Sequence, residues 1–459
     1  MHRPGGNAFA LLALAACACS SRAGGERGPD EDGVVHLVGW VTGPEPSAFA
    51  RKTNLIEGAR RLNQELAAAG DRRRVAIDVD FNTTSHDPYV KKLVFAFASG
   101  RGPDIACGGH EIVGTFAPPG YLVPLDDYLA ARPEFRADFF PVLWSAMSWR
   151  GVVYAVPQDN EVRLAYIAKK PLRALGWSDA DIDQLSDTVE RGDLSLDDLA
   201  ELVEKAVSAG AVKSERGLYH RNRSGFDWLE FLLAYGGRLE DPATGRLVLS
   251  RRATLATLRL FDRLVEHRAL PPGMTSYTER TIYRDFVDGD VLVWLTGGSW
   301  HKLEFQGAFE LTDADFRARI AWFPVPGGAR GRPPVSVSHP FGCAVAASAP
   351  DRELAFRVIQ RSIDPDLDVG HAIKSSHLVV RKSSSESGPY QADPFLRDMI
   401  DLLRFTHFAP NHAKLTRLQR ILFDGIRGVE VGVLSPEEAL DFVVRVCRAR
   451  MGDDVVIED

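Results

Sequence analysis

The sequence predicts an α/β protein whose domains are interleaved, with the chain crossing between them. Strand and helix patterns alternate along the first third of the chain, which is typical of a parallel α/β layer. The chain has 459 residues, and at ~100–200 residues per domain this allows more than one core. No long linker divides the sequence into consecutive domains. The domains are therefore expected to share the chain instead of following one another along it.

Five elements in the first third support this fold class. Residues 34–41 form an apolar run, as expected of a strand that is buried on both faces. Residues 55–66 carry apolar side chains at helical spacing, and residues 75–81 alternate as in a strand. Helical spacing returns over 90–97, and a short strand follows at 104–107 after a Gly-Pro breaker. The predicted order is β-α-β-α-β.

Helices dominate the rest of the chain. Ser195 and Asp198 have the spacing of a capping box ahead of an apolar helix over 199–206. The glycine-rich segment 327–334 is expected to be a loop, because no helical pattern follows it. Further helices are expected over 255–265 and 354–359 and from the N-cap Ser435, and a further strand is expected over 291–295.

The composition excludes several classes of protein. Hydrophobic residues make up 45% of the chain and charged residues 25%, as in soluble globular proteins. Disordered, collagen-like and polytopic membrane proteins are therefore excluded. The 55 Lys and Arg residues stand against 62 Asp and Glu, a formal net charge of −7. A mildly acidic chain lacks the basic footprint of a nucleic-acid-binding protein, so no nucleic-acid partner is expected.

The first residues predict export. Arg3 precedes an apolar run over 8–18, which is too short to span a bilayer and suits the core of a signal peptide. The run ends in Leu14-Ala15-Ala16-Cys17, which resembles a bacterial lipobox, in which the cysteine after the cut carries the lipid. We expect a signal peptide over 1–16, lipidation at Cys17 and a flexible tether over 17–33. A cut before Cys19, or an ordinary signal peptide cut nearby, remains open.

The other cysteines match no recognised pattern. Their spacings fit no zinc site, and they are too few for a disulfide framework in a chain of this length. Cys107, Cys343 and Cys447 are expected to be small buried hydrophobic residues. Export would permit a disulfide, although nothing in the sequence demands one.

Motifs of catalysis, phosphate binding and metal binding are missing from the sequence. Ser85, His86 and Asp87 are adjacent and cannot face one another as a triad. The aspartates at 364, 366 and 368 imitate a calcium loop, but the turn glycine is one place late and Ser375 replaces the bidentate Glu. The loop over 327–334 lacks the Gly-Lys-Ser/Thr end of a phosphate cradle. We therefore expect a protein that is not an enzyme and holds no cofactor or metal.

Polar and aromatic residues gather at the ends of predicted strands and helices. Ligands of open α/β sheets bind beyond the carboxyl ends of strands. Flat aromatic rings beside carboxylates and amides suit a polyhydroxylated ligand such as a sugar. Core packing is the alternative for each tryptophan, and a solvated or capping role is the alternative for each glutamate. The candidate ligand-binding residues are Trp40, His110, Glu111, Gln158, Asp159, Glu161, Trp228 and Trp300.

A set of weak motifs in collinear order resembles a known family. The motifs are ASGRGPDI at 98–105, GYLVPLDDYL at 120–129, GVVYAVP at 151–157, FVDGD at 286–290, GSW at 298–300 and HLVVRK at 377–382. Together with the lipobox, they resemble the extracellular solute-binding proteins of ABC importers, family 1, which are similar to maltose-binding protein.

The resemblance implies a two-lobed fold of the type II periplasmic-binding-protein kind, with a hinge and a ligand cleft between the lobes. Lobe 1 would comprise 34–155 and 341–390, and lobe 2 would comprise 157–338 and 391–459. A monomer would capture a small solute, most readily a sugar, by hinge closure. It would deliver the solute to ABC permease subunits while lipid-anchored to the outer face of the cell membrane or in the periplasm.

Two other functions remain open on the same sequence. A secreted carbohydrate-active enzyme would use a carboxylate pair such as Glu111 and Glu161. A sensory or interaction protein of the same fold would close on its ligand but signal to a receptor or kinase. Arg163 is the nearest cationic residue to the candidate pocket, and it would admit an acidic or zwitterionic ligand.

Overall fold

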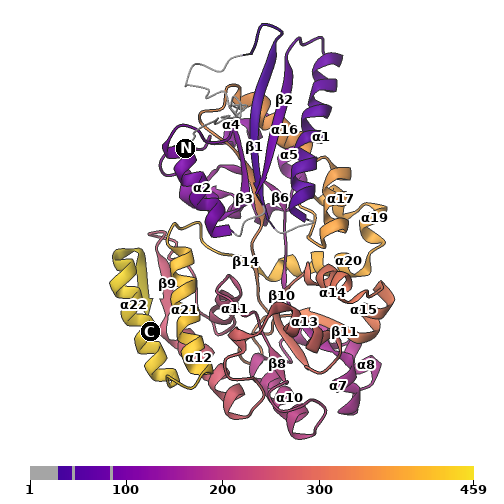
Figure 1. Cartoon of the computed structure of the whole chain (residues 1–459), viewed down its shortest axis with the longest axis vertical. Helices are drawn as coiled ribbons and strands as arrows, with labels where there is room; N and C mark the ends of the chain where they lie inside the picture. The colour runs from indigo at the N-terminus through magenta and orange to yellow at the C-terminus, as the bar shows by residue number, and fades with distance from the viewer. Residues whose placement is uncertain (1–28, 44–46, 83–85) are drawn as a thin grey trace, which may run out of the picture.

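Two separate hydrophobic cores make up the interior of the protein in the computed structural model, which describes residues 29–43, 47–82 and 86–459. The cores occupy the upper and lower halves of the molecule, and segments far apart in the sequence connect the halves (Figure 1). The signal peptide and Cys17 lie outside the described residues, as does Ser85. The arrangement is the predicted two-lobed α/β fold with interleaved lobes.

The sheet of the first lobe shows the interleaving directly. Its strand order is β2-β1-β3-β13-β6, and β1 pairs in parallel with both β2 and β3, as predicted. Strand β13 returns late in the chain to pair antiparallel with both β3 and β6. The bounds are β1 Val34–Thr42, β2 Arg74–Asn82, β3 Ile105–Gly109, β6 Ala155–Asp159 and β13 Phe341–Val345.

Helices cover this first sheet as the apolar spacing predicts. Helix α1 (Ser47–Ala68) buries Leu55, Leu62 and Leu66. It packs against α16 (Arg352–Ser362) so closely that a Cβ at Gly58 would lie 2.6 Å from the carbonyl oxygen of Val358. Helix α2 (His86–Ala98) supplies the second predicted helix.

The second lobe is built on a four-stranded sheet in the order β11-β7-β10-β8. Capping boxes begin α10 at Ser195 and α22 at Ser435, as predicted. The strands are β7 Arg163–Ala168, β8 Leu218–Tyr219, β10 Val293–Gly298 and β11 Ile320–Pro324. The longer helices are α10 Leu196–Ser208, α12 Arg251–Glu266, α21 Leu415–Glu430 and α22 Pro436–Met451.

Small two-stranded sheets and short helices complete the fold. The paired strands are β4 Ser148–Trp149 with β5 Val152–Val153, β9 Leu247–Ser250 with β15 Val455–Glu458, and β12 Ser336–Ser338 with β14 Thr406–Phe408. The other helices are α3 Glu111–Phe116, α4 Asp126–Ala130, α5 Pro133–Asp138, α6 Pro141–Ala146, α7 Lys169–Ala174, α8 Asp179–Asp183, α9 Leu185–Glu190, α11 Asp227–Ala234, α13 Glu279–Val287, α14 His301–Phe309, α15 Asp313–Arg319, α17 Pro365–Ser375, α18 Lys382–Ser385, α19 Gly388–Gln391 and α20 Pro394–Asp401.

Two segments of the chain lie close to the predicted boundaries between the lobes. Strand β6 carries the chain to Asp159 within the first sheet before β7 begins the second at Arg163. Helix α17 contacts α1 of the first lobe. Apolar side chains of residues 369–379 nevertheless belong to the core of the second lobe. The segment after α16 therefore lies against both lobes.

The structure corrects the prediction for two cysteines. Cys107 and Cys343 are buried, as expected, but they form a disulfide that joins β3 to β13. The two residues are direct partners in the antiparallel register of these strands. Their separation of 236 residues hides this pairing from the sequence. Cys447 is buried and free, as predicted.

The three aspartates that imitate a calcium loop belong instead to the start of α17. Asp364 and Asp366 form ion pairs with Arg61 of α1. Asp368 is buried and accepts hydrogen bonds from the backbone N–H groups of Val380 and Arg381, at 3.2 Å. Burial raises the pKa of Asp368 to about 7. The hydrogen bonds from Ser384, Val380 and Arg381 lower the pKa but do not offset the effect of burial.

The disulfide yields a first prediction. The test uses protein that begins at residue 34, after the tether, and so lacks Cys17 and Cys19. When this protein is unfolded without reductant, an alkylating reagent should label Cys447 alone, as measured by mass spectrometry. Replacing Cys107 and Cys343 by Ser should lower the melting temperature, because a closed loop of 236 residues typically contributes about 2–4 kcal/mol. Cys447→Ser is the control and should leave the disulfide intact. Labelling of all three cysteines without reductant would contradict the pairing.

Asp368 yields a second prediction. A carboxyl group whose pKa is raised on folding favours the folded state at low pH, and this contribution is lost as the pH rises from about 4 to 7. Asp368→Asn should therefore gain stability relative to the wild type between pH 5 and pH 8, by at most about 1.4 kcal/mol per pH unit. The pKa of Asp366 is lowered by Arg61, so Asp366→Asn should show a constant difference over this range. Urea unfolding at both pH values provides the measurement, and a fixed difference for Asp368→Asn would refute the assignment.

Candidate functional site

The segment that joins β6 to β7 lies where the two lobes meet. Asn160 forms a bridge with Leu378, and the Ser338 hydroxyl donates to the side-chain oxygen of Asn160. Three passes of the chain therefore come together, and the side chains from Gln158 to Arg163 are all buried between them. This is the boundary at which a ligand cleft was predicted.

A buried ion pair anchors the end of β6. The Nε of Arg51, from α1, donates to Oδ2 of Asp159 at 2.6 Å, and each side chain is 1% exposed. The guanidinium also lies 3.6 Å from the ring centroid of Phe341, and Nε2 of His371 lies 3.2 Å from Asp159. Burial raises the pKa of Asp159, but the charge of Arg51 and the His371 hydrogen bond outweigh this and hold it well below its usual value.

A second charged group surrounds Arg163, at the start of β7. Its guanidinium lies 3.1 Å from Glu161 and 3.2 Å from Asp227, the first residue of α11. Burial raises the pKa of Glu161, and Arg163 opposes the change only in part. Burial also raises the pKa of Asp227, but Arg221 and Arg163 together lower it below its usual value. The pKa of Glu161 is therefore raised whereas that of neighbouring Asp227 is lowered, so Asp227 loses its proton more readily.

The indole of Trp300 forms one wall of this group. The guanidinium carbon of Arg163 lies 4.5 Å from its ring centroid, and that of Arg221 lies 5.9 Å away. The His377 ring stacks at 5.9 Å with an interplanar angle of 13°. Just before Trp300, buried Thr296 adopts φ 61° where the register of β10 shifts. A β-branched residue at positive φ is strained, and such strain gathers at functional sites.

A third group lies at the end of β3. Nε2 of His339 lies 2.7 Å from Oε2 of Glu111, and Nδ1 of His110 lies 3.6 Å from the same oxygen. The ring of Phe226 stacks on His339 at 4.3 Å. His339 comes from the chain that crosses from β12 to β13, so this group again joins residues from distant parts of the sequence.

Several buried polar atoms on the crossing segment, residues 158–163, or on residues beside it have no hydrogen-bond partner among the described residues. Buried polar groups are rarely left unpaired in a folded protein, so a concentration of them marks a place where a polar ligand or water completes the bonding. These atoms are Gln158 Nε2, Asp159 Oδ1, Asn160 Nδ2, Arg163 Nη1, Ser299 Oγ and His377 Nδ1.

The structure brings most, but not all, of the predicted site residues together. Gln158, Asp159, Glu161 and Trp300 lie along the crossing segment or beside it, and His110 and Glu111 meet His339. The sequence analysis missed five further members, for which no local pattern in the sequence gave a signal: two lie inside α1 and α17, and the others lie in connecting segments. They are Arg51, Arg221, His339, His371 and His377.

Two tryptophans lie elsewhere. The ring of Trp40, at the end of β1, stands 4.2 Å from the ammonium of Lys92. Trp228 is 1% exposed and packs in the aromatic core of lobe 2 against Phe231 and Phe261. One residue advances a helix by about 100°, so Asp227 faces Arg163 while Trp228 faces the core. For Trp228, the alternative of core packing describes the structure.

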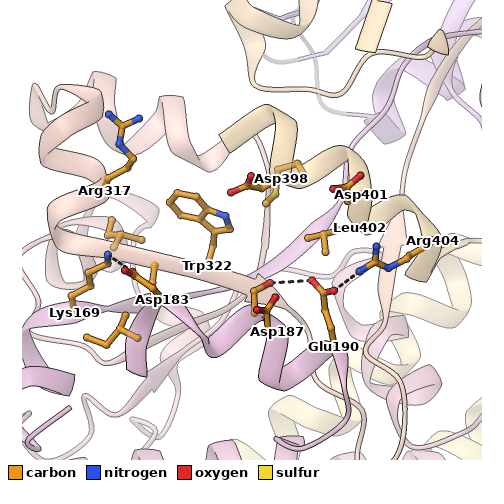
Figure 2. A pocket seen from close by; sticks show the side chains of 15 residues that line it. Lys169, Asp183, Asp187, Glu190, Arg317, Trp322, Asp398, Asp401, Leu402 and Arg404 are labelled. Atoms are coloured by element: carbon orange, nitrogen blue, oxygen red, sulfur yellow. Dashed lines mark hydrogen bonds and ion pairs between the residues drawn. The ribbon is translucent and has the colours of Figure 1, made fainter. Parts of the chain in front are cut away.

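A hollow of about 550 Å³ lies on lobe 2, between α8, α9, β11 and α20. Figure 2 shows Trp322 at its centre, with Lys169 paired to Asp183 and Arg404 paired to Glu190 at its sides. The predicted site residues do not line this hollow. A substitution in this hollow can therefore serve as a control for substitutions in the crossing segment.

The family is shown by direct comparison. Residues 63–360 match the model of the bacterial extracellular solute-binding proteins, and the chain belongs to this family. A Brucella abortus protein described only as a binding protein is 21% identical over 381 residues, which cover 82% of this chain and 86% of the relative. The maltotriose-binding protein of Pyrococcus abyssi is 32% identical over 78 residues, 17% of each chain.

Solved structures of similar fold cover almost the whole chain. The GacH receptor of Streptomyces glaucescens superposes with a TM-score of 0.70 at 20% identity, covering 90% of this chain and 97% of the receptor. The sugar-binding protein MalE of Xanthomonas citri gives 0.70 at 19%, covering 90% and 96%. These likenesses establish the two-lobed fold.

The helices that the structure describes were also compared with the length and hydropathy of a membrane span. None of them meets both requirements.

The buried pair at the end of β6 yields a third prediction. Asp159→Asn removes the partner of a buried arginine, and breaking such a pair typically costs about 3–5 kcal/mol. Glu57→Gln disrupts the partly exposed ion pairs with Arg60 and Arg61 on the same helix as Arg51, where about 0–1 kcal/mol is expected for each pair. Thermal unfolding should show a large loss for the first variant and a small one for the second. Equal losses would mean that Arg51 does not depend on Asp159.

Proposed function

We propose that this chain is the extracellular substrate-binding component of an ABC importer, and that its solute is a sugar. Membership of the solute-binding family and the two-lobed fold support the binding role. The observation that carries the proposal is the row of buried polar atoms on the segment from Gln158 to Arg163 that find no hydrogen-bond partner in the described part of the chain; this segment joins the two lobes. A solute held there would touch both lobes at once.

The chemistry of this segment suits hydroxyl groups. Each hydroxyl can donate to a carboxylate such as Glu161 and accept from an amide such as that of Gln158. Hydrogen bonds to charged groups contribute about 1.5–3 kcal/mol each. A ring face laid on Trp300 adds about 25 cal/mol for each Å² of apolar surface removed from water. Five or six such contacts, less the cost of association, correspond to micromolar affinity, about −8 kcal/mol.

Known relatives of the fold support the choice of a sugar. The Streptomyces glaucescens receptor was solved with acarbose, a Thermotoga lettingae solute-binding protein with tagatose, and Thermotoga maritima MalE3 with maltose. The charges of the cleft refine this choice. Arg163 and Arg221 are already balanced by Asp227 and Glu161, so an uncharged ligand leaves the pairing intact.

Hinge closure would couple binding to transport. The open form would present separate half-sites, and a solute that bridges them would favour the closed form by its difference in affinity for the two states. We propose that the closed form docks on membrane permease subunits, and that partner chains hydrolyse ATP. Lipidation at Cys17, after removal of residues 1–16, would hold the protein near the permease through the tether over 17–33.

A ligand screen and two matched variants make the fourth prediction. In thermal-shift assays of the chain from Ser20 onward, a neutral sugar at a hundred times its Kd should add about 2.7 kcal/mol of stability. Trp300→Ala and Glu161→Gln should each weaken binding of that sugar at least tenfold, measured by calorimetry, because each removes a contact of the proposed site. Trp300→Ala should remain folded, since Trp300 is only half-buried. Glu161 is buried beside Arg163, so circular dichroism is used to establish that Glu161→Gln is folded before its affinity is compared.

The control is Trp322→Ala, in the hollow on lobe 2. It should leave the sugar affinity unchanged, because Trp322 packs against Phe316 and Phe395, away from the crossing segment. Loss of affinity in Trp322→Ala alone would move the site to that hollow. Hydrolysis of the sugar, followed by chromatography, would contradict the importer proposal and favour a carbohydrate-active enzyme.

A further inference from the structure

Three potential metal ligands converge at the end of β3. One ring nitrogen each of His110 and His339 and a carboxylate oxygen of Glu111 all lie within 4.8 Å of one another. His110 and Glu111 are buried, and His339 is partly exposed, so the group has a buried side and a side that solvent can reach. In a tetrahedral Zn²⁺ site with bonds of 2.0–2.1 Å, donor atoms lie ~3.3 Å apart. Small side-chain movements would bring the three atoms to that spacing.

The orientation of His110 suits a ligand. Its Nε2 lies 2.8 Å from the carbonyl oxygen of Ala409. A carbonyl can only accept a hydrogen bond, so Nε2 carries a proton, and in the neutral form of the ring Nδ1 presents its lone pair. That lone pair is on the side of Glu111, 3.6 Å from Oε2. Metal-bound histidines almost always donate their other N–H to a carbonyl or carboxylate in this way.

The side chains of His339 and Glu111 pack closely against the backbone at Gly109. A Cβ at Gly109 would lie 2.1 Å from Nε2 of His339 and 2.6 Å from the carboxylate oxygens of Glu111. Gly109 does not have a positive φ, so the glycine serves the close approach of these groups. The Phe226 ring, stacked on His339 at 4.3 Å and 24°, fixes the imidazole plane.

We propose that His110, Glu111 and His339 form a binding site for a divalent transition-metal ion, best matched by Zn²⁺. Two imidazole nitrogens and one carboxylate oxygen are a donor set that Zn²⁺ prefers over Ca²⁺ or Mg²⁺, which take oxygen ligands. Three protein ligands leave the fourth tetrahedral position for water or a solute atom. The sequence offered no metal-binding spacing because His339 lies 228 residues after Glu111.

A metal ion bound at this site would connect two distant parts of the chain. His110 and Glu111 follow β3 of lobe 1, whereas His339 belongs to the crossing between β12 and β13. Phe226, which packs on His339, precedes α11 of lobe 2. A bound ion would tie the crossing chain to the first lobe beside Glu161, whose pKa already responds to His339. Metal binding should therefore raise the melting temperature of the protein.

Titration of the chelator-treated protein with ZnCl₂ tests the proposal. The chain from Ser20 onward, free of any affinity tag, should bind one Zn²⁺ in calorimetry, and its melting temperature should rise. His339→Gln and Glu111→Gln should each weaken Zn²⁺ binding at least tenfold. His267→Gln should not, although His267 is an exposed histidine that also lies near a carboxylate, 3.9 Å from Glu204.

Co²⁺ gives a second readout that does not depend on any variant. Wild-type protein should develop visible d–d absorption on addition of Co²⁺, and Zn²⁺ should abolish it in a 1:1 ratio. Circular dichroism would establish that the variants remain folded. The proposal is overturned if wild-type protein takes up neither ion, or if His267→Gln loses as much Zn²⁺ affinity as His339→Gln. Either result would leave the group as a hydrogen-bonded His–Glu cluster.

Discussion

The buried ion pair at the point where the chain leaves lobe 1 is the constraint on which the rest of the structure depends. Arg51 and Asp159 are both almost fully buried, and neither could remain there without the other. Arg51 comes from the first helix, while Asp159 ends a strand that continues into the second lobe. Because the partners come from distant elements, the charges are neutralised only when both elements are in place. The pair thereby fixes the start of the crossing segment.

The same segment concentrates the chemistry of the protein. Beyond Asp159 the chain carries Glu161 and Arg163, and lobe 2 adds Asp227 and Trp300 around them. These charges balance one another where the chain enters lobe 2, so a neutral ligand leaves their pairing intact. The metal site proposed at His110, Glu111 and His339 stands at the neighbouring crossing. The proposed solute site and the proposed metal site therefore lie on neighbouring crossings of the chain.

Much of the fold could be predicted from local patterns. The strand at 34–41, the helix at 55–66 and the capping boxes at Ser195 and Ser435 appear where periodicity and capping chemistry place them. The site was predicted in part, because Asp159, Glu161 and Trp300 stand at the ends of strands. Trp228 shows the limit: a single helical step decides whether a side chain faces Arg163, as Asp227 does, or the core, as Trp228 does.

The sequence by itself determined the α/β class, the interleaving of the lobes and the family, because these depend on periodicity, missing linkers and collinear motifs. Only the tertiary structure decided which distant residues meet. Cys107 bonds to Cys343, and Glu111 meets His339, across more than 200 residues. Such contacts depend on strand register and on the order of strands in the sheet. No local signal in one sequence encodes them, since each partner is unremarkable until the fold brings the two together.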